Sequence, residues 1–166
     1  MGDDGIGPFV IKSMESQVDF PENVELADLG TPSFDLPVYL SSANALILVD
    51  SAMFDREAGT IRLFRKSDIF RDPPRTRIDP HSPALKESLF FLEQIGQMPS
   101  DFLLVGVQGS RFDVGTGLSV SVRETVPIVI DAVLRELHRL NAPACAAERP
   151  RRPGIWWESS SINSKR

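Results

Sequence analysis

The sequence predicts an α/β fold built on a largely parallel β-sheet. Two short, continuous apolar runs, at residues 45–50 and 102–107, have the length and composition of strands that are buried on both faces. Segments with apolar residues at helical spacing lie around these runs, and strands that alternate with helices are typical of parallel sheets. Because such folds bind ligands at the carboxyl ends of their strands, polar residues that follow a strand are candidates for function.

The other predicted elements follow from local patterns. Helices are expected at about residues 8–20, 34–43, 82–95 and 119–140, and further strands at 24–28 and 61–65. Pro8 suits the first turn of a helix, where its missing N–H would have no partner. The 61–65 strand alternates polar and apolar residues, which favours an edge position. Residues 66–80 are rich in Pro and Arg and are expected to form a loop.

Length and composition predict one domain and limit its function. Residues 1–140 are expected to form that domain, and the Pro- and Arg-rich residues 141–166 a disordered tail. A net charge of −5 gives no general attraction for nucleic acid. No apolar run approaches the ~20 residues of a membrane span, no signal peptide precedes the acidic start, and the single cysteine cannot form an internal disulfide. A cytoplasmic protein that binds no membrane is therefore expected.

Three polar groups are expected at the functional end of the sheet. Residues 2–7, GDDGIG, place an acidic pair just before the first helix, Asp50 ends an apolar strand, and His81 precedes the 82–95 helix. Each alone is more often a cap or a loop residue, but all lie at junctions that can converge on one face. Two carboxylates and an imidazole suit a borderline divalent ion such as nickel, zinc or cadmium. His138, within the last helix, is expected on a solvated face.

A receiver-like phosphoacceptor domain is one alternative. Such domains also have an early acidic pair and a phosphate-accepting aspartate at the end of a strand, and the spacing of Asp4 and Asp50 fits that pattern. Their chemistry also needs a lysine after a later strand. Gln108 and Gly109 stand there in this chain, and His81 would have no role. The receiver interpretation is therefore the weaker one.

The order of these motifs resembles the hydrogenase maturation proteases, which process the large subunit of nickel–iron hydrogenases. The resemblance covers roughly residues 1–140. It is carried by GDDGIG at 2–7, DLGT at 28–31, DL at 35–36, LILVD at 46–50, GTI at 59–61, PH at 80–81, LVGVQ at 104–108 and GLS at 117–119. The resemblance implies a three-layer αβα sandwich around a twisted, mostly parallel sheet.

The resemblance also implies a site and an activity. Asp4, Asp50 and His81 would be the metal-binding and catalytic residues, with Asp3 shaping the turn beside Asp4. The family removes a short C-terminal extension from the hydrogenase precursor after nickel insertion, and the substrate's own nickel is the expected recognition element. An endopeptidase is therefore expected, with the large-subunit precursor as partner, no organic cofactor and a monomeric state. A truncated, non-catalytic homologue that binds the precursor or metal is the second hypothesis.

The chain departs from the family pattern at several positions. Leu29 and Ser33 stand where the family has glycines, and Asp79 replaces the usual serine before the Pro-His pair. The family also has a hydrophobic strand before its acidic loop, and this first strand is missing from the sequence. Loss of a central strand would remove on the order of 6–12 kcal/mol of apolar burial, which rivals the stability of a domain. We therefore expect Met1 to be an internal methionine of a longer chain.

Overall fold

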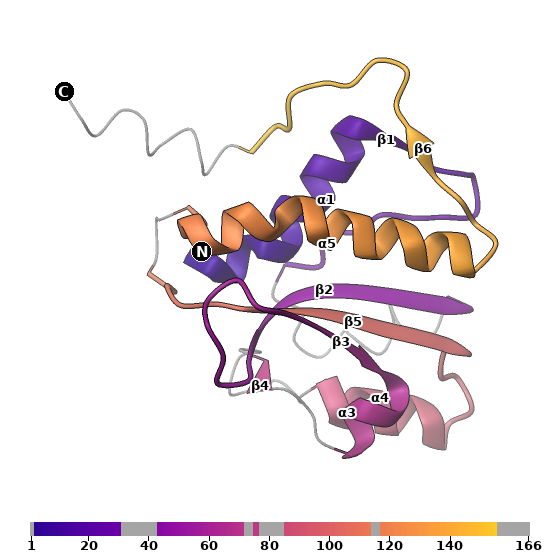
Figure 1. Cartoon of the computed structure of the whole chain (residues 1–166). Helices are drawn as coiled ribbons and strands as arrows, with labels where there is room; N and C mark the ends of the chain where they lie inside the picture. The colour runs from indigo at the N-terminus through magenta and orange to yellow at the C-terminus, as the bar shows by residue number, and fades with distance from the viewer. Residues whose placement is uncertain (1, 31–42, 72–74, 77–84, 114–116, 156–166) are drawn as a thin grey trace.

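A mixed β-sheet forms the centre of the molecule. The computed structural model describes residues 2–30, 43–71, 75–76, 85–113 and 117–155 (Figure 1). Within these residues the sheet has the order β3-β5-β2-β4. Its strands are β2 (Ala45–Met53), β3 (Ile61–Arg65), β4 (Arg75–Thr76) and β5 (Asp101–Gln108). β2 and β5 run parallel, whereas β3 is antiparallel to β5 and β4 is antiparallel to β2.

Helices cover both faces of this sheet (Figure 1). The helices are α1 (Ile6–Gln17), α3 (Lys66–Arg71), α4 (Leu85–Gln94) and α5 (Val120–Arg139). On one face, apolar residues of α1 and α5 pack against alternate residues of β5, among them Val105 and Val107. On the other face, α3 and α4 pack against Phe102 and Leu104. The period-two alternation of β5 thus supplies both apolar clusters, and the predicted α/β class is confirmed.

The longest elements agree with the sequence prediction because local signals define them. α5 begins directly after Ser119, whose side chain accepts a hydrogen bond from the Val122 N–H and caps the helix. β5 is buried along nearly its whole length, as its continuous apolar run predicts. β3 pairs only with β5 among the described strands, in agreement with its predicted edge position. No helix of the described segments has the length and apolar character to cross a bilayer.

Three predicted features of the sheet are wrong or not confirmed. Residues 24–28 form no strand, because none of the described strands lies beside them to accept their backbone hydrogen bonds; Val24 and Leu26 instead pack against the α1 and α5 cluster. Residues 45–50 of β2 are half-buried rather than buried on both faces, and of the described residues only β5 pairs with them. A mostly parallel sheet is not confirmed, since β2–β5 is the one parallel pairing among the described strands.

Two segments predicted to lack regular structure contain it. Residues 66–80 include α3 and β4. In the predicted tail, β6 (Cys145–Ala146) pairs antiparallel with β1 (Val18–Asp19). The Ala147 and Arg151 N–H groups donate to carbonyls of Gln17 and Ser16 at the end of α1. Carbonyls at a helix C-terminus have no hydrogen-bond partner within the helix. The residues that follow β6 donate to these carbonyls, and the composition of the predicted tail did not indicate this order. Residues 156–166 and most of the predicted 34–43 helix lie outside the described residues.

A buried carboxylate connects α5 to the amino-terminal end of the sheet. Glu136 of α5 accepts hydrogen bonds from Arg65 at 2.8 Å and from Arg139 at 3.0 Å, and Arg139 also pairs with Asp101. The bond from Arg65 holds the pKa of the Glu136 carboxyl down at about 2, because with Arg139 it outweighs burial, which acts to raise it. The ionised carboxylate therefore stabilises the folded state.

We predict a pH-dependent role for Glu136 in stability. Its contribution is fully present above the ordinary glutamate pKa of 4.5 and is lost as the pH falls from 4.5 through about 2. Glu136→Gln should lower the free energy of unfolding by about 2 kcal/mol at pH 7, and the difference from the wild type should shrink toward pH 2. Urea denaturation at several pH values measures both effects.

Asp131→Asn provides the matched control. It disrupts an exposed ion pair with Arg135 on the same helix and should change the unfolding free energy by less than about 1 kcal/mol. A Glu136→Gln effect that is equally small, or that does not depend on pH, would contradict the prediction.

Candidate active site

The acidic loop lies at the carboxyl ends of β2 and β5. Residues Gly2–Gly5 form a single 3-10 turn, labelled η1, immediately before α1. Gly2 has a positive φ of 53°, and a Cβ there would lie 2.4 Å from the Arg111 carbonyl oxygen. The Asp3 N–H donates to that same carbonyl. Only glycine combines this backbone conformation with so close an approach, so Gly2 brings the acidic pair against the loop that follows β5.

Asp3 is fully buried and organises this loop. Its two carboxylate oxygens accept hydrogen bonds from the N–H groups of Ser110, Arg111 and Ser119, at 2.7–2.9 Å. The hydroxyls of Ser110 and Ser119 also donate to it. Burial by itself would raise the pKa of the Asp3 carboxyl, but these donors, Ser110 foremost, outweigh burial and lower it. Asp3 is therefore an ionised structural group, in agreement with its expected role in shaping the turn.

Ser51 brings the second acidic residue of the loop close to Asp50. The Ser51 hydroxyl donates to Asp4 at 2.7 Å, and the Ser51 N–H donates to Asp50 at 2.8 Å. Asp4 and Asp50 are both half-buried, whereas Ser51 between them is buried. Two of the three predicted ligands are thus neighbours at one strand end, as expected from their positions beside a strand and a helix.

The position of Asp50 makes its ionisation unfavourable. Burial raises the pKa of the Asp50 carboxyl to about 7; the hydrogen bond from the Ser51 N–H opposes this increase, and the charge of Asp4 adds to it. A carboxyl that titrates near neutral pH can take up or release a proton under the conditions in which enzymes work. The arrangement can therefore support acid–base chemistry as well as the binding of a cation.

Helix α1 holds Asp4 in place through a close contact with β2. A Cβ at Gly7 would lie 2.6 Å from the Val49 carbonyl oxygen, so the first turn of α1 rests directly on β2 beside Asp50. Gln108, at the end of β5, fixes the other border. Its buried side chain accepts from the Phe54 N–H and donates to the Gly109 carbonyl. The site thus lies between the contact of α1 with the β2 backbone on one side and the hydrogen bonds of the Gln108 side chain on the other.

The predicted metal-binding set is only partly described. His81 lies outside the described residues, and within those residues no group of three acidic, histidine or cysteine side chains could hold a metal ion. Asp4 and Asp50 can supply carboxylate oxygens to a divalent cation, and the full set with His81 stays a prediction. His138 is exposed on α5, as predicted.

Sequence reasoning missed the polar residues that position the acidic side chains. Ser51 directly follows the predicted strand, and Ser110 and Ser119 flank the glycine-containing loop after β5, but serines are common at such places. Their partners lie far away in the sequence, so no local pattern could have paired them with the acidic loop. Ser119 alone had a local signal, as the residue before the last helix.

The fold and this acidic site define an α/β protein that binds its ligand at the carboxyl ends of the strands. Comparison with known proteins identifies the family. Residues 8–136 match the family model described as hydrogenase maturation protease. The chain belongs to the hydrogenase maturation protease family, whose members are peptidases.

Named relatives agree with this family. The chain is 26% identical over 155 residues to the hydrogenase expression/formation protein HupD of Bradyrhizobium diazoefficiens, covering 89% of this chain and 81% of HupD. It is 26% identical over 149 residues to the hydrogenase 2 maturation protease of Escherichia coli, covering 88% and 89%. The solved structure of the hydrogenase maturating endopeptidase HybD from E. coli matches with a TM-score of 0.78 and 25% identity, over 88% of this chain and 90% of that one.

We predict that Asp3→Asn destabilises the fold without changing side-chain size. An amide has one acceptor oxygen, whereas both Asp3 oxygens accept backbone N–H groups, so either amide orientation points an NH₂ at a donor. The cost should be about 2–4 kcal/mol, measured by thermal or urea unfolding.

Asp19→Asn is the matched control for this change. Asp19 is exposed on β1, and its carboxylate accepts one long hydrogen bond among those described, from the Glu148 N–H at 3.4 Å. Its substitution should alter stability by less than about 0.5 kcal/mol. Equal effects of the two substitutions would refute the structural role of Asp3.

Proposed function

We propose that this chain is an endopeptidase that removes a C-terminal peptide from the nickel-loaded precursor of a hydrogenase large subunit. The family and the printed names of its relatives support this class of substrate. The observation that carries the proposal is the Ser51 bridge, because it brings Asp4 and Asp50 together at the carboxyl end of β2. An α/β sheet places its ligands at this end.

In this proposal Asp4, Asp50 and His81 engage the nickel ion that the substrate carries. Two carboxylates held close together repel each other, and a divalent cation between them would offset that repulsion. Carboxylate oxygen and imidazole nitrogen are suitable donors for nickel. A precursor without nickel would lack this contact and would bind less well, so the reaction would occur only after nickel insertion.

The reaction is the hydrolysis of one peptide bond. Water adds to the carbonyl carbon, the C–N bond breaks, one water proton is taken up by a carboxylate and a proton is delivered to the leaving amine. The substrate's nickel would polarise the carbonyl or the water. Asp4 or Asp50 would serve as the base.

We also propose how the layers of the fold are arranged, which oligomeric state the protein has and in which compartment it works. The apolar clusters on the two faces of the sheet support a three-layer αβα arrangement. The edge of β2 that faces away from β5 has no strand partner from Ala45 to Ser51 among the described residues. We expect a monomer, and the single cysteine supports a cytoplasmic setting.

The central test is cleavage of the nickel-loaded precursor. Asp4→Asn, Asp50→Asn and His81→Ala should each lower the cleavage rate by at least about 100-fold, because each removes a ligand or base. His138→Ala, which changes an exposed histidine on α5, should cleave at the wild-type rate. The shortening of the large subunit is followed by gel mobility and intact mass.

The same assay separates an enzyme from a binding module. A wild-type chain that captures the precursor in a pull-down but never shortens it would refute the endopeptidase and support the non-catalytic homologue. Cleavage that persists in all three variants would refute the assigned site.

Ser51 is expected to act as a positioning residue in this reaction. Ser51→Ala removes the hydroxyl that donates to Asp4 but keeps the N–H that donates to Asp50. We predict a fall in kcat of about tenfold with little change in KM, and a shifted pH profile of kcat. Ser51→Thr, which keeps the hydroxyl, should restore most of the rate. An unchanged pH profile in Ser51→Ala would contradict the role.

A further inference from the structure

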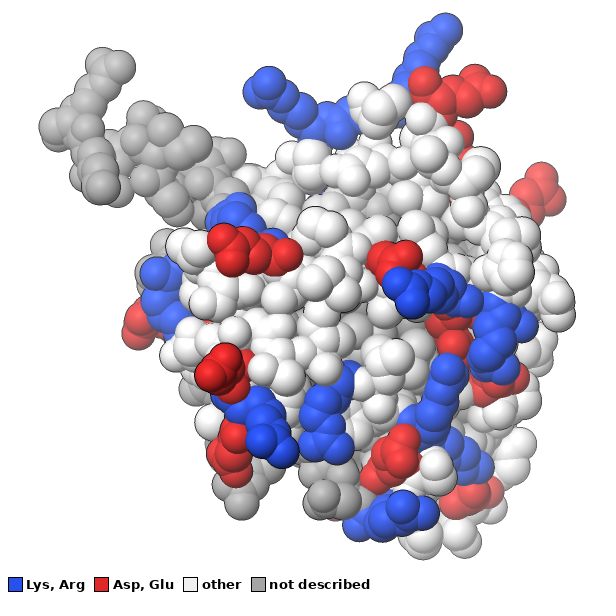
Figure 2. All heavy atoms as spheres, in the orientation of Figure 1, with Lys and Arg blue, Asp and Glu red and all other residues white. Residues whose placement is uncertain are grey.

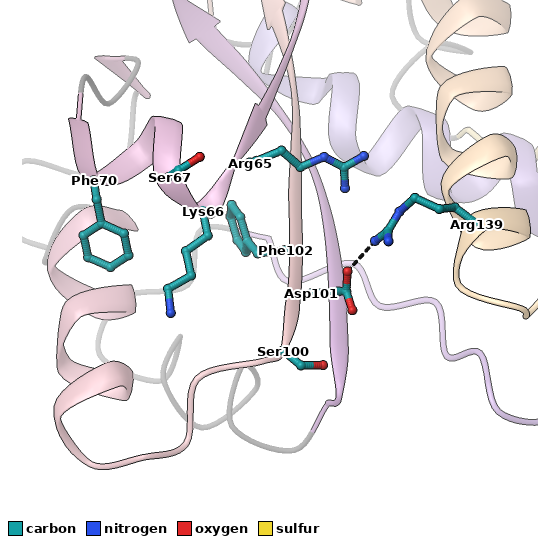
Figure 3. Close-up of a pocket in the computed structure, with 8 residues that line it drawn as sticks. All are labelled: Arg65, Lys66, Ser67, Phe70, Ser100, Asp101, Phe102 and Arg139. Atoms are coloured by element: carbon teal, nitrogen blue, oxygen red, sulfur yellow. Dashed lines mark hydrogen bonds and ion pairs between the residues drawn. The ribbon is translucent and has the colours of Figure 1, made fainter.

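Several arginines beside the sheet are neutralised by carboxylates. In Figure 2 many basic side chains lie directly beside acidic ones. Figure 3 shows one such place at the amino-terminal end of β5, where Arg139 turns toward Asp101. Arg65, at the same end, is bound to Glu136. These cations already have partners inside the protein and are not available to a ligand.

Arg62 of β3 has a different environment. Among the described residues, no carboxylate lies within ion-pair distance of its guanidinium, although the side chain is exposed. The guanidinium carbon lies instead 4.8 Å from the centroid of the Phe64 ring and 5.5 Å from that of the Phe54 ring. A cation–π contact satisfies none of the five N–H donors of an arginine, so these donors remain available to an anion.

The two rings that hold Arg62 are themselves fixed. Phe64 is buried, and its ring lies so close to β5 that a Cβ at Gly106 would be 3.1 Å from it. The Phe54 N–H donates to the Gln108 side chain at 2.9 Å, and the ring centroids of Phe54 and Phe64 are 6.2 Å apart. A cation on such a support has a defined position, so it loses little conformational entropy when it binds a ligand.

Arg62 lies on the same face of the sheet as Asp50. Asp50, Gly106 and Arg62 are aligned across β2, β5 and β3. Leu48 and Phe64, each two residues along a strand from this row, both contribute to the apolar cluster beneath α3 and α4. Because side chains alternate between the faces of a strand, Asp50 and Arg62 point to that same face. Neighbouring strands are about 4.8 Å apart, so the two residues are about 10 Å apart, a distance that about three extended residues span.

We propose that Arg62 binds a carboxylate of the precursor about three residues from the scissile bond, an inference that rests on the proposed function. Asp4 and Asp50 repel a carboxylate at the reacting end of the site, whereas Arg62 attracts one farther along the same face. A guanidinium and a carboxylate form two parallel hydrogen bonds, which fix orientation as well as position. Nickel holds the substrate at one point only. The pair with Arg62 would supply a second point and so determine which peptide bond lies at the site.

Two carboxylates of the precursor have this chemistry. One is the side chain of an aspartate or a glutamate near the scissile bond. The other is the terminal α-carboxylate of a short C-terminal extension. Both are planar and form the same pair with a guanidinium, so the source is decided by changes in the precursor.

The first part of the experiment changes the enzyme and follows cleavage of the nickel-loaded precursor. Arg62→Gln should raise the KM about tenfold and leave kcat within about twofold of the wild type, because the lost pair acts in binding. Arg62→Lys keeps the charge without the two-bond geometry and should retain a KM about threefold above the wild type. Arg135→Gln is the matched control. It removes an equally charged, exposed side chain that pairs with Asp131 on α5, and it should keep the wild-type KM.

The second part changes the precursor to identify the partner group. Each aspartate or glutamate within about four residues of the scissile bond is replaced singly by its amide. Another precursor carries added C-terminal glycines, which displace the α-carboxylate. One of these changes should raise the KM of the wild-type enzyme about tenfold but alter that of Arg62→Gln by less than about twofold, because the pair is already lost. The change that does so names the source of the carboxylate.

Two results would overturn the inference and leave the proposed function standing. One is a KM of Arg62→Gln equal to that of Arg135→Gln. The other is a set of precursor changes whose effects all multiply with that of Arg62→Gln. If the wild type does not cleave the precursor, the proposed function fails, and the uncut precursor is titrated instead. A Kd about tenfold weaker for Arg62→Gln than for Arg135→Gln would then support Arg62 as a binding residue, and equal Kd values would overturn it.

Discussion

The buried carboxylate of Asp3 is the constraint on which the geometry of the site depends. Bringing an ionised carboxylate out of water costs several kcal/mol, and the cost is recovered only when hydrogen bonds replace the lost hydration. Three backbone N–H groups and two hydroxyls, from Ser110, Arg111 and Ser119, supply these bonds. They come from the loop after β5 and from the cap of α5. The first residues of the chain, the end of β5 and the start of α5 are therefore held as one unit.

The neighbouring aspartates show how one backbone turn separates structure from chemistry. Within η1, Asp3 turns toward the loop after β5, whereas Asp4 turns toward Ser51 on β2. The two side chains have the same chemistry and differ only in their surroundings, so sequence composition cannot distinguish their roles. Because Asp3 is fixed by so many bonds, Asp4 has a defined position relative to Asp50. A preorganised pair of this kind loses little conformational entropy when it binds a substrate.

Local sequence signals predicted those parts of the fold that do not need a distant partner. The apolar run of β5, the apolar stripe of α5 and the alternation of β3 all gave the right element. Residues 24–28 have strand-like composition, but a strand also needs a neighbouring edge, and the described residues provide none there. The same limit applies to the site: Asp4 and Asp50 carried a visible motif, whereas Ser51, Gln108 and Glu136 acquire their roles from contacts with residues far along the chain. Tertiary partners of this kind are not encoded in any local pattern.

The pKa values of two carboxyl groups, one at each end of the sheet, are shifted in opposite directions. At the amino-terminal end, two arginines bind Glu136 and lower its pKa to about 2, so its charge stabilises the fold. At the carboxyl end, Asp50 lies beside Asp4, and burial raises its pKa to about 7, so its charge is held at a cost. A group that is poorly stabilised in the free protein gains the most when a cation or a proton arrives, and this gain is the energy that a binding or catalytic site can use. The bonds around Glu136 and Asp3 supply stability that allows the fold to keep such a pair.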